Sequence, residues 1–475
     1  MDLCLRMLLS LVLAAIAVPA AADPPMQGDG SLDSAPQPTT DAYDLSIDEA
    51  VGLAQQRSFK TARAERSLRE NELRYDNARS QYRPTLTTSA VINQQELDYG
   101  WHGNTFAYQV SSLGRFHGKA SANLSMPIDV AGVIHRQVVQ AGLWQGIASN
   151  DVTNTALDVT LDVETAYLNA LRAQNNADAD EAVAKEIEDL LARAGPKSTL
   201  GSFLQVELAN AQQTAQSSRE NADNAQDGLK QMLRVPPEAR LRLTSDFRGR
   251  RQPLDRNGLL ERALRMRPDV QSAMLRVKQA KTSVEQVSDS RKPTVRIGAF
   301  ASQEIGGGAI YDARYDRLRQ EGGLINVNVP LAQWDNGQLQ RNRQIAELQR
   351  EQADADLEEL RERVAYDVRQ QLLAVTRAEN RIRNLPDPKQ ARDALERVER
   401  MLLSAPPETA QGLVAQVSNA RQAWRSAETA TADAYIDYNN AVFRLKRLIG
   451  ESDTVSAKTI ATEIPVQTVG PASGQ

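Results

Sequence analysis

Residues 152–171, VTNTALDVTLDVETAYLNAL, belong to a segment whose pattern predicts one very long helix. The helical pattern extends from about Gly132 to Ala194, and neither proline nor glycine interrupts it from Ile147 onward. At 1.5 Å per residue such a helix would be roughly 90 Å long, which is far more than a compact domain needs. The segment therefore predicts an elongated helical structure.

Two apolar stripes run along this helix. The first has alternating spacings of four and three residues, and its members are Val152, Ala156, Val159, Val163, Ala166 and Ala170. The second consists of Leu157, Leu161, Leu168 and Leu171. One stripe is typical of a two-helix coiled coil, whereas two adjacent stripes indicate a helix that packs between neighbours on both sides. We therefore expect this helix to be part of a curved helical wall.

The second half of the chain repeats the first. Arg83–Leu86 aligns with Lys292–Val295 after 209 residues, and Gly228–Leu233 resembles Arg444–Ile449 after 216 residues. The difference is one heptad, an insertion that keeps an apolar stripe on the same helix face. The repeat divides the chain into a signal peptide (1–22), a flexible N-terminal segment (23–44), a first structural repeat of helix, two strands and long helical hairpin (45–233), a connector (234–254), a second structural repeat (255–450) and a polar C-terminal tail (451–475).

The first residues have the features of an export signal. Leu8–Val18 is apolar, and Ala20–Ala22 precedes Asp23 as a small-residue cleavage site. The apolar stretch is too short to span a bilayer, and no other run is long and apolar enough to do so. Cys4 is the only cysteine and lies in this leader, so the mature chain would have neither a disulfide nor a thiol nucleophile.

Four segments are expected to be strands. Phe116–Met126 alternates with period two over a length suited to crossing a membrane. The others are Thr85–Ile92, Val295–Gln303 and Leu324–Val329, with a glycine-rich loop, Gly306–Gly323, before the last. Four strands cannot close a barrel, whereas three chains would together supply twelve.

The remaining structure is expected to be helical. The predicted helices are Ser46–Tyr82, with Ser46 and Glu49 forming a capping box, Ser202–Leu233, Arg256–Arg291 with a break at Pro268, and Trp334–Asn384. A proline-containing tip, Pro386–Pro407, leads into a returning helix that ends at Ile449.

Signatures of catalysis are missing from the sequence. His102, His117 and His135 share no metal-ligand spacing, and Gly306–Gly308 is not followed by the Lys-Ser/Thr of a phosphate-binding loop. The net charge of −5, with no basic run, gives no reason to expect a nucleic-acid partner. We expect neither an enzyme nor a bound cofactor or metal.

Several motifs occur in an order that resembles the TolC-like outer-membrane efflux proteins, or outer membrane factors. They are LSIDEA at 45–50, RPTL at 83–86, VETAYL at 163–168, FLQVELANA at 203–211, RPDV at 267–270 and the closing segment 445–450. The resemblance implies an α+β membrane protein, mostly of long helices. It would be a homotrimer with a periplasmic α-helical barrel and a shared transmembrane β-barrel of twelve strands, four from each chain.

The resemblance also implies a function. Such proteins are passive exit ducts in the outer membrane that dock on a periplasmic adaptor (membrane fusion) protein and an inner-membrane transporter, in tripartite efflux or type I secretion. Polar strand positions are then candidates for the pore lining: His117, Lys119, Ser121, Asn123, Ser125, Asn326 and Asn328. The acidic ring of relatives cannot be carried over to Leu413–Gln416, so the gate candidates are Arg381, Arg383, Asp387 and Asp393, and we expect the second hairpin to open the tip.

A soluble periplasmic coiled-coil scaffold or adaptor is the alternative. An adaptor would have one helical hairpin flanked by lipoyl-like and barrel domains, and the duplicated strand pairs argue against it. The alternative predicts a soluble monomer rather than a trimer in the outer membrane.

Overall fold

The computed structural model describes residues 43–93, 117–195, 199–245, 254, 256–310, 313–329, 336–405 and 407–451. They form two compact units. The sheet unit contains the described parts of Leu73–Gly142 and Ala280–Gln349, and the helical unit those of Pro38–Glu72, Leu143–Gln279 and Arg350–Gln475. The expected signal peptide, most of the N-terminal segment and most of the polar tail lie outside the described residues.

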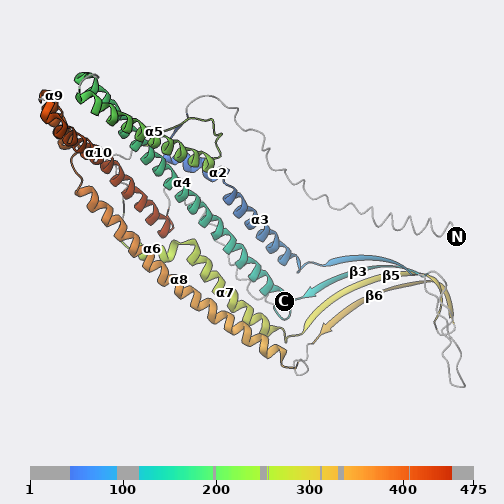
Figure 1. The fold of residues 1–475 in the computed structure, drawn as a ribbon. Helices are drawn as coiled ribbons and strands as arrows, with labels where there is room; N and C mark the ends of the chain where they lie inside the picture. Colours follow the sequence, from blue (N-terminus) through green and yellow to red (C-terminus); the bar gives the residue numbers. More distant parts are fainter. Residues whose placement is uncertain are drawn as a thin grey trace, which may run out of the picture. The chain divides into compact units, whose positions relative to one another are not determined.

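The first half of the chain contains the longest helix. Its elements are β1 (Tyr43–Leu45), α2 (Ile47–Arg57), α3 (Phe59–Ser80), β2 (Thr85–Asn93), β3 (His117–Ile128), α4 (Val133–Ala194), α5 (Thr199–Leu233) and β4 (Leu241–Leu243) (Figure 1). Helix α4 has 62 residues, which confirms the length predicted from its sequence. It starts after Gly132, whose φ of 73° favours glycine, and the Asp129 carboxylate accepts from the backbone N–H of His135 at 2.8 Å.

The N-terminal helix differs from the prediction in one respect. The capping box is present, because the N–H of Ser46 donates to the Glu49 carboxylate at 2.9 Å and the Ser46 hydroxyl accepts from the N–H of Glu49 at 3.3 Å. The single predicted helix is instead divided at Ser58, whose backbone is extended. The Ser58 hydroxyl accepts from the N–H of Lys60 and so starts α3.

A short parallel strand pair, β1 with β4, anchors the helical unit. Each of these strands has only three residues, too few for a periodic pattern, so the pair was not predicted. The Tyr167 hydroxyl on α4 donates to the Leu45 carbonyl at 2.9 Å and accepts from the N–H of Ser245 at 3.0 Å. Tyr167 is completely buried among side chains of α2, α4, α5 and α10.

The second half contains α6 (Leu259–Met266), α7 (Pro268–Asp289), β5 (Thr294–Ile310), β6 (Ala313–Asn328), α8 (Gln338–Arg383), α9 (Pro388–Ser404) and α10 (Pro407–Ile449). The break at Pro268 is confirmed, and α10 ends where predicted. The proline-containing tip, Pro386–Pro407, lies between α8 and α10 as expected, and most of it is an additional helix, α9. Asp387 caps that helix, and Pro388 occupies its first turn, where a missing N–H costs nothing.

The sheet unit contains one four-stranded antiparallel sheet in the order β2-β3-β5-β6. The register pairs Ser125 with Thr85 on one side and with Gly298 on the other, and Gly298 in turn with Leu324. Among the described residues, β2 pairs only with β3 and β6 only with β5, so both outer edges of the sheet lack a partner strand.

The strands are longer than predicted. The prediction of a loop at Gly306–Gly323 was wrong, because β5 continues to Ile310 and β6 starts at Ala313. Gly322 fits within β6 because the Phe300 ring of β5 occupies the space that a side chain would need. An added Cβ at Gly322 would lie 3.1 Å from that ring. Strand β3 likewise continues through Pro127 to Ile128, pairing there with β5 alone. Residues 94–115 of the other predicted loop lie outside the described residues.

Helices α4 and α7 are joined inside the sheet unit. Arg136 on α4 forms ion pairs with Glu285, at 2.7 Å, and with Asp289 on α7. The Gln140 amide donates to the Ser283 hydroxyl at 3.1 Å. These contacts connect the two halves of the chain next to the strands.

The boundaries of the sequence repeat itself remain a prediction. No helix in the described part of the chain is both long enough and apolar enough to cross a membrane.

Candidate functional site

The sheet has a polar face. In an antiparallel sheet, paired residues point to the same side, so the register shows which side chains share a face. Two contacts confirm the assignment, because the hydroxyl oxygens of Ser125 and Thr85 lie 3.0 Å apart and those of Ser121 and Ser89 lie 2.8 Å apart. This face, called the polar face below, includes the predicted residues Lys119, Ser121, Asn123, Ser125, Asn326 and Asn328. For His117 the structure describes the backbone in β3 but not the side chain.

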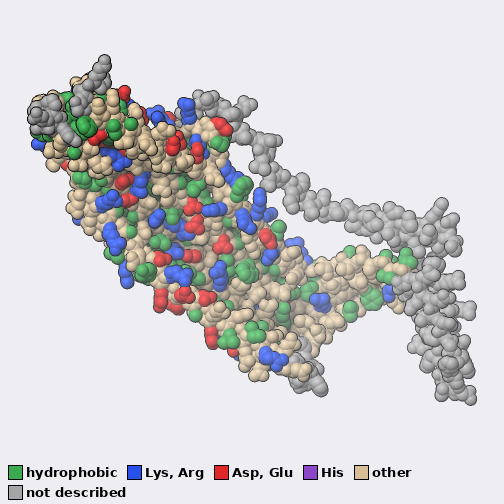
Figure 2. Space-filling model, viewed as in Figure 1, with side chains coloured by type: hydrophobic (Ala, Val, Ile, Leu, Met, Phe, Trp, Pro, Cys, Tyr) green, Lys and Arg blue, Asp and Glu red, His purple; other side chains and the backbone are tan. Residues whose placement is uncertain are grey.

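The opposite face is apolar and exposed in the single chain. Ile325 is 70% exposed and Leu86 66%, although residues of this kind are ordinarily buried. Others of the same face are Ile92, Leu124, Met126, Ile128, Ile297 and Val327. Figure 2 shows few charged side chains over the strands, whereas Lys, Arg, Asp and Glu are spread densely over the helices. An exposed apolar face of this size requires a nonaqueous surface or a partner.

The polar face also includes residues that were not predicted from the sequence, among them Thr85, Ser89 and the charged Arg296. Arg296 pairs with Asn326 on β6 and with Pro127 on β3, so it lies on the same side as the candidates above. It is exposed, and it contributes to a concavity of about 770 Å³ that is also lined by Asn123, Ser125, Asn326 and Asn328. The alternation of Arg296 with the apolar Val295 and Ile297 was the sequence signal that could have placed it on the polar face.

A second polar site lies in the helical unit, where α4, α5, α9 and α10 meet. We call it the ionic cluster and define it by Glu186, Glu207, Arg392, Glu399 and Arg421. The Arg421 guanidinium contacts the Glu207 carboxylate at 3.2 Å and the Glu399 carboxylate at 3.3 Å. Arg421 is 3% exposed and Glu399 is 7% exposed, so these charges depend on each other rather than on water.

The rest of the cluster extends it toward solvent. Arg392 on α9 pairs with Glu186 on α4 at 3.2 Å, and its guanidinium lies 4.7 Å from the centre of the Trp424 ring on α10. Apolar side chains from the same four helices surround the charges: Leu190, Leu204, Leu395, Leu402 and Val417. The cluster therefore connects the α4–α5 hairpin to α9 and α10 through charges within an apolar shell.

Two further ionic contacts join α4 to α10. Asp180 is 3% exposed. Its carboxylate forms an ion pair with Arg425 and accepts a hydrogen bond from the Ser218 hydroxyl at 2.6 Å. The hydrogen bond to Asp180 raises the pKa of Arg425. Nearer the middle of the helices, Arg172 contacts Asp433 at 3.0 Å and also contacts Asp437.

One of the predicted gate residues takes part in these contacts. Arg381 on α8 pairs with Asp437 at 2.7 Å and so joins the Arg172 network. Arg383 is exposed, Asp387 caps α9, and the exposed Asp393 accepts from Arg397 through its backbone carbonyl. The structure thus does not bring the four candidates together. Their role in a gate remains a prediction. The buried ion pairs described above involve other residues, Arg421 with Glu399 and Arg425 with Asp180.

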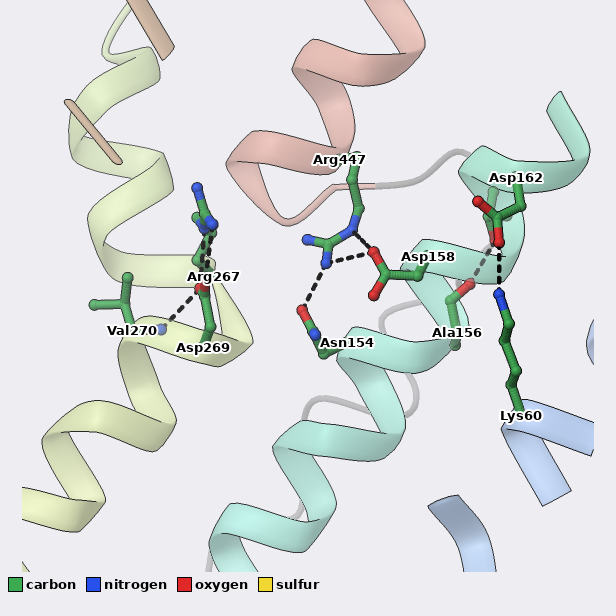
Figure 3. A network of polar contacts seen from close by, with 10 residues as sticks. Lys60, Asn154, Ala156, Asp158, Asp162, Arg267, Asp269, Val270 and Arg447 are labelled. Atoms are coloured by element: carbon green, nitrogen blue, oxygen red, sulfur yellow. Dashed lines mark hydrogen bonds and ion pairs between the residues drawn. The ribbon is translucent and has the colours of Figure 1, made fainter. Parts of the chain in front are cut away.

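Other ion pairs position α4 within the helical unit (Figure 3). Arg447 on α10 donates to Asp158 at 2.8 Å and to Asn154 at 2.7 Å, both on α4. On another side of α4, Lys60 of α3 pairs with Asp162 at 2.9 Å and its pKa is raised by that hydrogen bond. The two apolar stripes of α4 therefore have charged contacts beside them on both sides.

Glu186 makes the ionic cluster sensitive to pH. Burial raises its pKa above the ordinary value of 4.5, and Glu399 and Glu396 add to this, while Arg392 and Arg421 act in the opposite direction. A carboxyl group with a raised pKa in the folded state binds its proton more readily when folded. Stability attributable to this group therefore increases as pH falls through the raised pKa.

This linkage gives a first prediction, for Glu186→Gln. As pH is lowered from 7 toward 4.5, the thermal unfolding midpoint of the wild type should rise relative to that of the variant, because only the wild type gains a proton here. Both midpoints are measured in the same detergent by circular dichroism. A difference that is constant across this pH range would contradict the raised pKa.

Comparison with known proteins agrees with this architecture. The family model described as Outer membrane efflux protein matches residues 259–451. Searching the curated proteins finds no match. Solved structures with the same fold include the CmeC outer membrane channel of Campylobacter jejuni, with a TM-score of 0.65, 17% identity, and coverage of 87% of this chain and 88% of that one.

Two other solved structures cover the chain to a similar extent. A membrane protein from Pseudomonas aeruginosa has a TM-score of 0.68 and 16% identity, over 87% of this chain and 98% of that one. The open state of the MtrE outer membrane channel of Neisseria gonorrhoeae has a TM-score of 0.65 and 15% identity, over 86% and 91%. Residues 259–451 thus match the outer membrane efflux protein family, and the fold of the chain is that of TolC-like outer-membrane channels.

Proposed function

We propose that three copies of this chain form one passive exit duct through the outer membrane. The observation that carries the proposal is a four-stranded sheet with one apolar face, one polar face and two edges that have no partner strand among the described residues. Open edges and an apolar face are both unfavourable in isolation. Joining β2 of one copy to β6 of the next satisfies the edges, and three copies close a barrel of twelve strands.

In this assembly the apolar face contacts lipid and the polar face lines the pore. Ser121, Asn123 and Ser125 of β3 and Asn326 and Asn328 of β6 then face water, as the alternation along each strand requires. His117 and Lys119 extend the same row in β3. The helical units continue the duct in the periplasm, where we propose that it meets a periplasmic adaptor protein and an inner-membrane transporter. The duct itself performs no catalysis and needs no cofactor.

The ionic cluster is the proposed lock of the periplasmic end. It joins the first hairpin, α4 and α5, to α9 and α10 through buried ion pairs, and Asp180 with Arg425 adds a second connection. Buried ion pairs are poor sources of net stability but are costly to break singly, which suits a switch between two arrangements. We propose that α9 and α10 move away from α4 and α5 when the duct opens.

Cross-linking tests the assembly. Cys4 is the only native cysteine, so the chain is an almost cysteine-free background for introduced pairs. One cysteine of each pair is placed in β2, at positions 86–90, and the other in β6, at positions 320–326. Pairs that face each other between copies should form disulfides in outer membranes, and the covalent ladder should end at three chains. Cysteines placed on β3 and β6, which are separated by β5, serve as the control. A soluble monomer without cross-links would support the scaffold alternative instead.

A further inference from the structure

Arg296 on the polar face has no ion-pair partner among the described residues. It is exposed at the start of β5. Lys119 is the other cation of this face with a described side chain, and it has an interaction partner. The charged residues on the opposite face also compensate each other, since Arg319 pairs with Glu321 at 3.0 Å. Arg296 is thus the position from which an electric field extends into the concavity.

Arg296 is the only charged residue among those that line this concavity, and its polar neighbours there are neutral. Asn326 is its registered neighbour on β6, and Asn328 and Thr294 form the next pair toward the helices. Asn123 and Ser125 of β3 line the same concavity. Amides and hydroxyls solvate ions of either sign, so they neither cancel nor reinforce the charge. The sign of the field at this level of the sheet is therefore set by one residue.

The position along the strands is also defined. Strand β5 starts at Thr294, directly after α7, and β3 ends at Ile128, shortly before α4. Arg296 consequently lies at the end of the sheet where the strands meet the helices, which is the periplasmic end in the proposed duct. Every solute leaving the helical part would pass this level.

We infer that Arg296 makes the duct prefer anions. This inference rests on the proposed function, because only a closed assembly of three copies turns one arginine into a ring of three charges. Rings of arginine or lysine favour anions in pores. Because the Debye length is about 10 Å at 0.1 M salt, the ring should act on ions across a narrow aqueous pore at that concentration, and much less at 1 M, where the length is about 3 Å. Small inorganic anions and solutes with carboxylate or phosphate groups are the class it favours.

The test is ion selectivity in planar bilayers, with the purified assembly and a KCl gradient. The reversal potential gives the chloride-to-potassium permeability ratio for the wild type, Arg296→Gln, Arg296→Glu and the matched control Arg319→Gln on the opposite face. At about 0.1 M salt the ratio should fall about two- to fourfold in Arg296→Gln. It should fall further in Arg296→Glu and stay at the wild-type value in Arg319→Gln. The differences should shrink at about 1 M salt.

The outcomes separate this inference from the function on which it rests. Conducting channels whose permeability ratio is the same in the wild type and in both Arg296 variants overturn the inference and leave the proposed duct intact. A change in ratio that is undiminished at high salt also overturns it, since it would report pore geometry rather than charge. A wild-type protein that gives neither cross-linked trimers nor conductance overturns the proposed function, and with it the inference.

Discussion

Replacing Arg421 with alanine should loosen the contact between the two hairpins and lower stability by about 3–5 kcal/mol, because it leaves two carboxylates without their shared cation. Glu399 is 7% exposed and cannot regain full hydration while the helices stay packed. The least costly response is separation of α9 and α10 from α4 and α5, which would admit water to Glu207 and Glu399. We therefore expect both a lower thermal unfolding midpoint and a higher channel conductance in planar bilayers.

Two variants make this test specific. Arg444→Ala removes an arginine from the same helix, α10, at an exposed position without an ion pair among the described residues, and should change stability by no more than about 0.5 kcal/mol. Adding Glu399→Gln to Arg421→Ala removes one uncompensated charge and should restore part of the loss, which a double-mutant cycle measures. A stable Arg421→Ala channel with wild-type conductance would rule out the ionic cluster as a lock.

Replacing Tyr167 should have an effect of similar size by a different route. Its ring is completely buried where α4 passes β1 and β4, and Tyr167→Ala would leave a cavity costing about 3–5 kcal/mol. Tyr167→Phe keeps the ring and removes only the hydroxyl, which leaves the Leu45 carbonyl and the Ser245 N–H without this partner. That loss should cost about 1–3 kcal/mol.

Thermal and urea unfolding of both Tyr167 variants measure this difference, with Tyr366→Ala as the matched control. Tyr366 on α8 is 61% exposed, so its replacement should change stability by no more than about 0.5 kcal/mol. Conductance of the Tyr167 variants should stay near that of the wild type, because the ion pairs of the ionic cluster do not include this residue. Equal losses in Tyr167→Phe and Tyr366→Ala would show that the hydroxyl does not anchor the strand pair.

Several elements could be predicted because their determinants are local. The length of α4 follows from its apolar stripes and from the absence of proline and glycine after Gly146. The helix break at Pro268 follows from the missing N–H of proline, and the start at Ser46 follows from a capping box that spans four residues. Alternation assigned the polar and apolar sides of β3 in the same way.

Elements that depend on neighbours were predicted less well. The prolines of the tip indicated a break between two helices, but not that a third helix, α9, would start there with Pro388 in its first turn and Asp387 as its cap. The glycines of 306–323 indicated a loop, yet pairing with β5 and the ring of Phe300 keep Gly322 in a strand. In both cases the local propensity was read correctly, and contacts elsewhere in the structure decided between two permitted outcomes.

By itself, the sequence determined the alternation of long helices and strand pairs, the export signal it predicts, and the family resemblance. These depend on periodicity and on turn-forming residues, which act within a few positions. Only the tertiary structure decided which charges meet. Asp180 and Arg425 are 245 residues apart, and Arg421 and Glu207 are 214 apart, so no spacing rule links them. The alternation of residues 295–297 indicates only which side of β5 Arg296 occupies, and the register with β3 and β6 showed that no described carboxylate pairs with it.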